Sequence, residues 1–312
     1  MLTIEHLSKT FPGGVTALDD VSLRIPKGMF GLLGPNGAGK STLMRIIATL
    51  LVPDSGSVRL DDIDVVKDKD ALRARLGYLP QDFGTYPRVT PEELLEHLAV
   101  LKGIADRDAR RELVDALLAA TNLTGLRKRR IDTFSGGMKQ RFGIAQALIG
   151  NPALIIVDEP TAGLDPSERR RFHNLLSRIG EGVVVILSTH IVEDVTDLCP
   201  RMAILGDGKI LLEGEPQVLV DELDGRLWER FIDERELTEV QDQFNVVSTQ
   251  LRAGRTLIRV LAERSPGAAF GLAEPSLEDV YFATLSRHGV EPAGGGPLRV
   301  SCSLHLRAAS SA

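Results

Sequence analysis

The feature that most constrains this chain is the segment Gly34–Ser41, which fits the phosphate-binding P-loop pattern in full. Its glycines let the backbone curl until consecutive N–H groups face inward, and with the N-terminus of a following helix these dipoles favour a polyphosphate. We expect Lys40 to reach the β- and γ-phosphates and the Ser41 hydroxyl to ligate Mg²⁺. The predicted phosphate-binding residues are Gly34, Pro35, Asn36, Gly37, Ala38, Gly39, Lys40, Ser41 and Thr42.

The flanks of this segment favour a binding loop over a chance glycine-rich turn. The apolar run Met29–Leu33 suits a buried strand, and a helix is expected from Lys40 to Leu50. Strand, loop and helix in this order are the context that the pattern requires. Kinases, GTPases, helicases and transport ATPases all contain such a loop, so the other motifs must separate these classes.

Hydrophobic spacing divides the rest of the chain into strand and helix regions. A capping box with proline at the first helical position, Thr90–Glu93, opens a leucine-rich helical region. Farther on, two apolar strands flank a helix, an order that indicates a parallel sheet with crossover helices. The expected elements are short strands in 3–33, a hairpin in 58–66, helices in about 85–150, and strands at 154–157 and 183–187.

The pattern weakens after about residue 222. Strands of a small α+β domain are expected at 227–231, 246–251 and 256–260. Residues 288–312 contain a run of three glycines and no aromatic residue, which predicts a disordered tail. The sequence therefore predicts three parts: residues 1–221, residues 222–287 and the tail 288–312.

Two carboxylates follow the apolar strand Leu154–Val157. In P-loop enzymes an aspartate at this position holds Mg²⁺, so Asp158 is the predicted metal ligand, beside Ser41. Glu159 lies one residue farther, where it can orient or deprotonate an attacking water. The alternative is an exposed pair of acids at a strand end, which the complete P-loop disfavours.

The octet Phe134–Arg141 resembles the signature of the ATP-binding cassette family. Phe134 and Met138 depart from the commonest form, whereas the Ser-Gly-Gly core is intact. The resemblance spans the first 220 residues and implies a P-loop α/β fold with a RecA-like core, an antiparallel β subdomain, a helical subdomain and a small C-terminal α+β domain. It also implies that the octet contacts an ATP bound to a second cassette, through Ser135, Gly136, Gly137 and Gln140.

Four further positions match motifs of this family. Gln81 lies where the family has its Q-loop glutamine, which links the metal and the attacking water to the membrane partner; a solvated amide is the alternative. Asp165 resembles the dimer-facing D-loop aspartate and is also suited to an N-cap before Pro166. His190 matches the switch histidine that contacts the γ-phosphate, and Phe11 resembles the aromatic that stacks on adenine. A structural histidine and a hydrophobic plug are the respective alternatives.

The segment Glu274–Tyr281 is similar to a C-terminal motif in ATPase subunits of bacterial ABC-2 type exporters, including antibiotic-resistance and sodium-efflux systems. In physical terms it is a helix start, with a serine cap and acids in the first turn. The basic run Arg127–Arg130 is interpreted as a solvated loop. Cys199 and Cys302 are expected to be reduced thiols, because two cysteines do not make a disulfide framework.

Charge and hydropathy limit the partners. Lys and Arg number 37 against 43 Asp and Glu, a net charge of −6, which disfavours non-specific nucleic-acid binding. The N-terminus has no signal-peptide pattern, and the apolar runs fall short of the ~20 residues needed to cross a bilayer. Action at a membrane therefore requires a partner that spans it.

The resemblance implies an ATP-hydrolysing subunit, using ATP and Mg²⁺, that dimerises with a second copy or a homologous cassette. Lys40, Gln81, Glu159 and His190 are the implied catalytic set, with Gln81 also near the metal. Such a subunit drives export through an ABC-2 type permease at the cytoplasmic face of the membrane. The alternatives are a cassette protein that acts on ribosomes or DNA, an importer ATPase, and a small-molecule kinase. No residue indicates the transported substrate.

Overall fold

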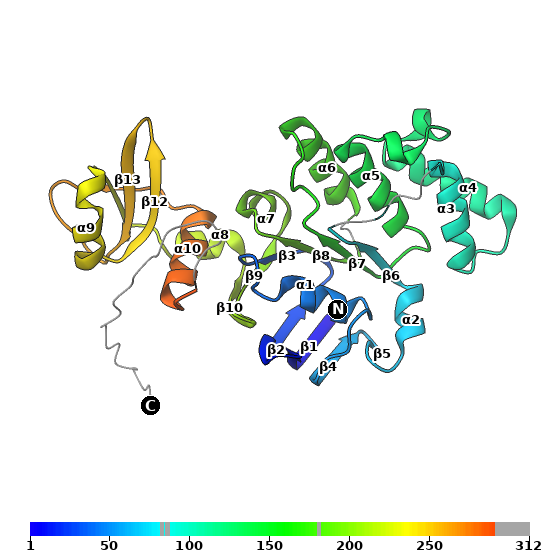
Figure 1. Cartoon of the computed structure of the whole chain (residues 1–312), viewed down its shortest axis with the longest axis horizontal. Helices are drawn as coiled ribbons and strands as arrows, with labels where there is room; N and C mark the ends of the chain where they lie inside the picture. The colour runs from blue at the N-terminus through cyan, green and yellow to red at the C-terminus, as the bar shows by residue number, and fades with distance from the viewer. Residues whose placement is uncertain (82–83, 85–87, 180–181, 291–312) are drawn as a thin grey trace. The chain divides into compact units, whose positions relative to one another are not determined.

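The structure is a computed structural model that describes residues 1–81, 84, 88–179 and 182–290. The chain divides into two compact units between Pro216 and Gln217, five residues before the boundary expected from the sequence. Figure 1 shows the elements of both units. Within the described ranges, no helix combines the length and the apolar composition that crossing a membrane requires.

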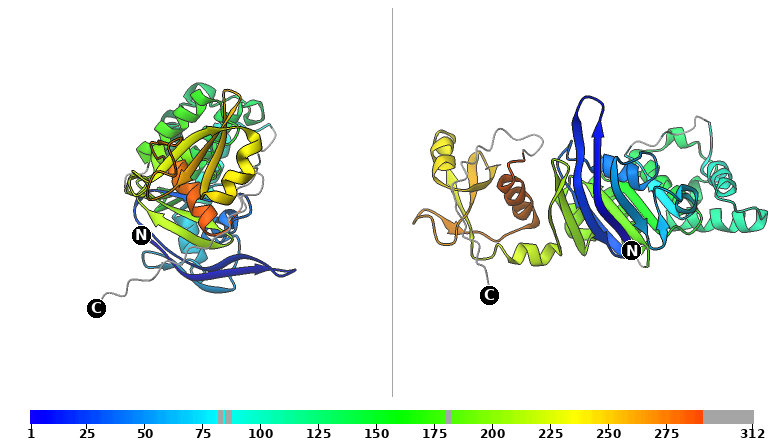
Figure 2. Two further views of the ribbon diagram at one scale, coloured as in Figure 1. Left: turned by 90° about the vertical axis from the view of Figure 1, so that its left-hand side faces the viewer. Right: turned by 90° about the horizontal axis from the view of Figure 1, so that it is seen from below.

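Two sheets build the first unit. An antiparallel sheet has the strand order β2-β1-β4-β5, and a mostly parallel sheet has the order β10-β9-β3-β8-β7-β6. Figure 2 shows the long β1–β2 hairpin of the antiparallel sheet. The strands are β1 (Leu2–Phe11), β2 (Val15–Ile25), β3 (Gly28–Leu33), β4 (Ser55–Leu60), β5 (Ile63–Asp64), β6 (Leu76–Leu79), β7 (Leu154–Asp158), β8 (Val184–Thr189), β9 (Arg201–Gly206) and β10 (Lys209–Gly214).

Helices cover both faces of the parallel sheet because β3 is apolar on both sides. Phe30 and Leu32 share one core with helix α1 and the antiparallel sheet. Gly31 points to the other face, where a Cβ would lie 2.7 Å from the side chain of Val195. The helices of this unit are α1 (Lys40–Ile47), α2 (Lys69–Ala74), α3 (Pro91–Leu101), α4 (Arg107–Ala120), α5 (Gly136–Ala147), α6 (Pro166–Ile179) and α7 (Val192–Leu198).

A separate apolar core holds the helical subdomain together. Helices α3, α4 and α5 contribute Leu95, Leu118 and Phe142 to it, and Phe134 packs edge-on against Phe142 at 6.5 Å between ring centroids. The predicted capping box is present, because the Thr90 side chain accepts from the N–H of Glu93 and the Glu93 carboxylate accepts from the N–H of Thr90. The predicted P-loop α/β fold with its β and helical subdomains is therefore confirmed.

The second unit is a four-stranded antiparallel sheet with a helix on each face. Val246 packs with α9 in one core, and its neighbour Val247 packs with α10 in another. The predicted Ser276 cap is present, since its side chain accepts from the N–H of Asp279. The strand order is β12-β13-β11-β14. The elements are α8 (Pro216–Asp221, across the boundary), β11 (Leu227–Ile232), α9 (Leu237–Gln243), β12 (Val246–Arg252), β13 (Arg255–Leu261), β14 (Gly271–Leu272) and α10 (Leu277–Arg287).

Three expectations need correction. Helix α1 ends at Ile47 and not at Leu50, because Thr49 takes a left-handed backbone (φ 62°) that reverses the chain. Eight strands and α-helices were not predicted: strands β6, β9, β10 and β14 and helices α2, α7, α8 and α9. The tail does not begin at residue 288, since the His288 N–H bonds to the carbonyls of α10 and Val290 is buried. The rest of the expected tail lies outside the described residues.

Gly77 is a position where the fold excludes any side chain. A Cβ there would lie 2.0 Å from the carbonyl oxygen of Ala147, where β6 passes the C-terminus of α5. Gly77→Ala is therefore expected to destabilise the first unit by about 1–3 kcal/mol, because backbone must move to admit it. Thermal melting followed by circular dichroism measures this loss. Gly125→Ala is the matched control, as a Cβ at Gly125 meets nothing within 4 Å, and an equal loss in both variants would contradict the explanation.

Candidate functional site

The P-loop is shaped by contacts that only glycine permits. Gly39 has a left-handed backbone (φ 105°), and a Cβ on it would lie 2.3 Å from the carbonyl oxygen of Ala17. A Cβ on Gly34 would lie 2.3 Å from the carbonyl oxygen of Leu205. The loop therefore lies directly against β2 and β9, with its curled backbone fixed between two strands.

A cavity of about 240 Å³ opens over this loop. Residues that follow three strands reach it, with Gln81 after β6, Glu159 after β7 and His190 after β8. These strands are adjacent and parallel, so their carboxyl ends meet at one edge of the sheet. The P-loop residues that line the cavity are Pro35, Asn36, Gly37, Ala38, Gly39, Lys40, Ser41 and Thr42, together with Ala17.

Lys40 is a buried cation that lines this cavity. Its side chain is 5% exposed, and its Nζ donates to the carbonyl oxygens of Gly34 at 2.6 Å and Pro35 at 3.2 Å. Burial lowers the pKa of the Lys40 ammonium from its ordinary value, although the negative charges of Glu159 and Asp158 oppose that effect. A bound polyphosphate would supply the anion that such a buried ammonium favours.

The Glu159 carboxylate lies between the Lys40 ammonium and the His190 imidazole. Its Oε1 lies 3.6 Å from Lys40 Nζ, and its Oε2 lies 2.6 Å from His190 Nδ1. A carboxylate only accepts hydrogen bonds, so the hydrogen of this contact is on Nδ1 and the Nε2 of His190 remains for another partner. Glu159 itself has a left-handed backbone (φ 49°), which costs a non-glycine residue about 1–3 kcal/mol. Its N–H, donating to the Ser188 carbonyl at 2.8 Å, helps to hold that turn.

Comparison with known proteins places this arrangement in a family. The family described as ABC transporter matches residues 18–162. The linearmycin resistance ATP-binding protein LnrL of Bacillus subtilis is 36% identical over 227 residues, which cover 72% of each chain. The chain belongs to the ABC transporter family. The sequence-based assignment to this family is therefore confirmed.

Two further relatives are also named as ATP-binding proteins. The daunorubicin resistance protein DrrA3 of Streptomyces coeruleorubidus is 35% identical, with 72% of this chain and 71% of DrrA3 covered. YbhF of Escherichia coli, named as a multidrug ABC transporter ATP-binding protein, is 38% identical over 72% of this chain. This chain matches only 39% of the length of YbhF.

The cassette MJ0796, solved as a dimer in a post-hydrolysis state with ADP and Pi, superimposes with a TM-score of 0.63. It is 30% identical to this chain, and the match covers 69% of this chain and 98% of the solved one. An ATP-binding subunit of an ABC transporter matches with a TM-score of 0.64 at 28% identity, over 71% of this chain and 92% of the solved one.

The donor set of this ABC cassette fits a magnesium ion. Asp158 is 4% exposed at the end of β7, and its buried Oδ1 has no hydrogen-bond partner in the described structure. Ser41 places a hydroxyl at the cavity. Mg²⁺ prefers such oxygen ligands together with substrate phosphates, whose charge it neutralises. Asp158 and Ser41 are thus the residues that would hold the ion. Ser41 and Gln81 line the cavity, whereas Asp158 lies next to Glu159 and does not line it.

The signature residues do not line the cavity of their own chain. Ser135 is the N-cap of α5 and accepts from the N–H of Met138 at 3.3 Å. Gly136 and Gly137 form the first turn, and Gly137 faces Glu168 of α6 so closely that a Cβ would lie 2.3 Å from the carboxylate. The buried Oε1 of Gln140 lacks a partner among the described residues.

Asp165 and Phe11 also lie outside the cavity. Asp165 Oδ1 accepts from the N–H of Ser167 and the N–H of Glu168, both at 2.9 Å. This is the N-cap geometry that the sequence indicates, and these hydrogen bonds hold the pKa of Asp165 below its ordinary value. Phe11 is 36% exposed at the end of β1, so it is not a buried plug, and its adenine contact stays a prediction.

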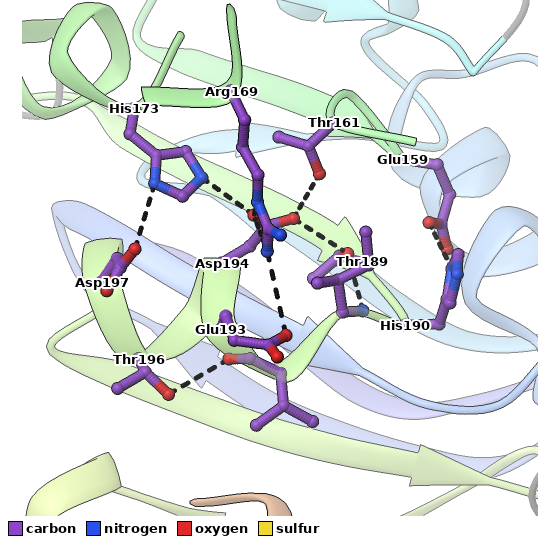
Figure 3. Close-up of polar contacts among 12 residues, drawn as sticks. Glu159, Thr161, Arg169, His173, Thr189, His190, Glu193, Asp194, Thr196 and Asp197 are labelled. Atoms are coloured by element: carbon purple, nitrogen blue, oxygen red, sulfur yellow. Dashed lines mark hydrogen bonds and ion pairs between the residues drawn. The ribbon is translucent and has the colours of Figure 1, made fainter. Parts of the chain in front are cut away.

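A polar cluster behind Glu159 and His190 was missed from the sequence. It consists of Asp194 on α7, Thr161, Thr189, and Arg169 and His173 on α6, and we call it the Asp194 cluster (Figure 3). The Asp194 side chain is completely buried. Its sequence context, Glu-Asp in a short acidic helix, is typical of solvated acids, so no pattern in the sequence predicts that Asp194 is buried.

Proposed function

We propose that this chain binds and hydrolyses ATP and drives export through a separate membrane-spanning permease of the ABC-2 type. The observation that carries the proposal is the convergence of Lys40, Gln81, Glu159 and His190 on one cavity from neighbouring strand ends. Relatives named for linearmycin resistance, daunorubicin resistance and Nod factor export support the direction of transport and its link to antibiotic resistance. The proposed location is the cytoplasmic face of the membrane, through the permease.

In the proposed mechanism the chain's own residues divide the work. Lys40 and the P-loop amides hold the β- and γ-phosphates. Ser41 and Asp158 would hold Mg²⁺, which would supply charge neutralisation there. Glu159 accepts the proton of the attacking water, and His190, held by Glu159 through Nδ1, presents Nε2 to the γ-phosphate. Gln81 links this site to the permease, and Phe11 stacks on adenine.

A second copy, or a homologous cassette, completes the site in this proposal. Ser135, Gly136, Gly137 and Gln140 would contact the ATP of the partner, with Asp165 at the contact between the two copies. The signature residues are not among those that line the cavity on one chain, which supports this arrangement, as does the dimeric state of the cassette MJ0796. A site completed by a partner couples hydrolysis to closure of the dimer.

Co-purification tests the proposal. We expect the chain to be recovered with membranes only when it is co-expressed with a membrane protein encoded by a neighbouring gene. That protein should have about six apolar segments of ~20 residues. The complex should then hydrolyse MgATP. Expression with an unrelated membrane protein is the control. Recovery with ribosomes whether or not the permease is present would overturn the export function and favour a ribosomal role.

A further inference from the structure

We propose that Asp194 is a positioning residue, whose buried carboxylate holds the Glu159 turn, the His190 turn and helix α6 in one arrangement without touching the nucleotide. The inference rests on the proposed ATPase function and assigns a new residue to it. Figure 3 shows the carboxylate between side chains from three separate segments. Its consequence is that loss of Asp194 slows hydrolysis while leaving nucleotide binding in place.

The carboxylate is buried and charged. Arg169 Nε and His173 Nε2 each lie 2.8 Å from Asp194 Oδ1. Burial acts to raise the pKa of Asp194, but the hydrogen bonds from His173 and Thr161 and the charge of Arg169 outweigh it, so the pKa is lowered. An ionised carboxylate only accepts, so each of its partners must donate to it, and this fixes the orientation of both threonine hydroxyls.

Thr161 connects Asp194 to the Glu159 turn. Its hydroxyl donates to Asp194 Oδ2, and it is two residues after Glu159 in the chain. The Thr161 carbonyl oxygen accepts from the N–H of Leu164 at 3.1 Å. The left-handed turn at Glu159 is therefore anchored on its C-terminal side by a buried charge.

Thr189 connects the same oxygen to the His190 turn. Its hydroxyl donates to Asp194 Oδ2 at 3.4 Å and accepts from the N–H of Ile191 at 3.0 Å. His190 lies between Thr189 and Ile191, so the Thr189 hydroxyl joins the residues on both sides of His190. Because Asp194 fixes the direction of the hydroxyl hydrogen, a lone pair of that oxygen is left to face Ile191. Asp194 thereby sets the backbone from which His190 reaches Glu159.

Arg169 and His173 bring helix α6 to the same carboxylate. They are four residues apart and so lie on one face of the helix. Helix α6 begins directly after Asp165, which caps it. A displacement of Asp165 would therefore move α6 against Asp194 and, through the two threonines, against both catalytic turns.

Asp194→Asn tests the inference with almost no change of shape. The amide cannot accept from all the donors, so we expect kcat for ATP to fall by about 10–100-fold. KM for ATP should stay within about twofold of the parent value, because Lys40 and Ser41 are untouched. Asp70→Asn is the matched control, since it makes the same exchange on helix α2, where the side chain is 99% exposed and outside the Asp194 cluster. It should keep the parent kcat.

A second pair of variants covers the case in which Asp194→Asn does not fold. Thr189→Val keeps the shape and removes the hydroxyl, whereas Thr189→Ser keeps the hydroxyl. We expect Thr189→Val to lower kcat by about tenfold and Thr189→Ser to restore it. In a double-mutant cycle, Asp194→Asn added to Thr189→Val should cost less than the two effects combined, because both break the same connection.

The imidazole resonance of His190 gives a readout independent of turnover. In ¹³C-histidine-labelled protein, with the resonance assigned by His190→Ala, it should shift in Asp194→Asn and Thr189→Val but not in Asp70→Asn. An unchanged resonance, a parent kcat in Asp194→Asn, or equal losses in Thr189→Ser and Thr189→Val would each overturn the positioning role. If the parent itself does not hydrolyse ATP, the proposed function fails, and the resonance alone decides whether Asp194 positions His190.

Discussion

Glu159→Gln is expected to reduce ATP turnover by about 10³-fold or more while leaving ATP binding close to the parent level. The amide cannot take up the proton of the attacking water, a contribution that is typically worth about 10²–10⁴-fold. The P-loop and Lys40 remain, so calorimetry with MgATP should give an affinity within a few fold of the parent. Because hydrolysis no longer releases the closed dimer, size-exclusion chromatography with ATP should show a trapped dimer.

Glu112→Gln is the control for this prediction. It makes the same chemical exchange in α4, where the side chain is exposed and outside the cavity. It should turn over at the parent rate and form no trapped dimer. Hydrolysis by Glu159→Gln at the parent rate would remove Glu159 from its assigned role.

Lys40→Ala is expected to weaken MgATP binding by about 100-fold or more. The ammonium is buried in the cavity and makes two hydrogen bonds to loop carbonyls, which the β- and γ-phosphates would replace. A hydrogen bond to a charged group contributes about 1.5–3 kcal/mol, and loss of two such bonds gives a factor of this order. Calorimetry with MgATP measures the change directly.

Lys209→Ala is the control for the loss of a positive charge. Lys209 pairs with Asp19 at 3.0 Å on the surface, where its side chain is 60% exposed. Its loss should leave MgATP binding unchanged. Thermal melting of both variants separates a lost ligand contact from unfolding, because Lys40→Ala also leaves Glu159 buried without its cation. Parent affinity in folded Lys40→Ala would contradict the phosphate-binding role.

The parts of the site that could be predicted from sequence are those with a fixed local spacing. The P-loop requires glycine at positions such as Gly39, where backbone from β2 approaches, and that requirement is visible as a pattern. Asp158, Glu159 and His190 could be placed because apolar runs precede them and parallel strands end together. The helical subdomain followed from its leucine spacing and its capping box at Thr90.

The parts that could not be predicted depend on contacts between distant segments. Strand β6 is four residues long and contains Gly77, so neither length nor propensity marked it, and its place at the sheet edge depends on α5 passing close by. Asp194 is buried because Arg169, His173, Thr161 and Thr189 converge on it. The spacing of these four residues from Asp194 follows no helix or strand period, so the sequence does not show that they meet. A short helix with three acidic residues predicts a solvated face instead.

The strand order has a consequence for how the protein is made. Strand β3, which leads into the P-loop, pairs with β8 and β9, both encoded far downstream. At about 5–20 residues per second, on the order of ten seconds pass on the ribosome before either neighbour emerges. During that interval an apolar strand has two unpaired edges, a condition that promotes aggregation. Nascent chains of this protein should therefore depend on chaperones until β8 and β9 have been synthesised.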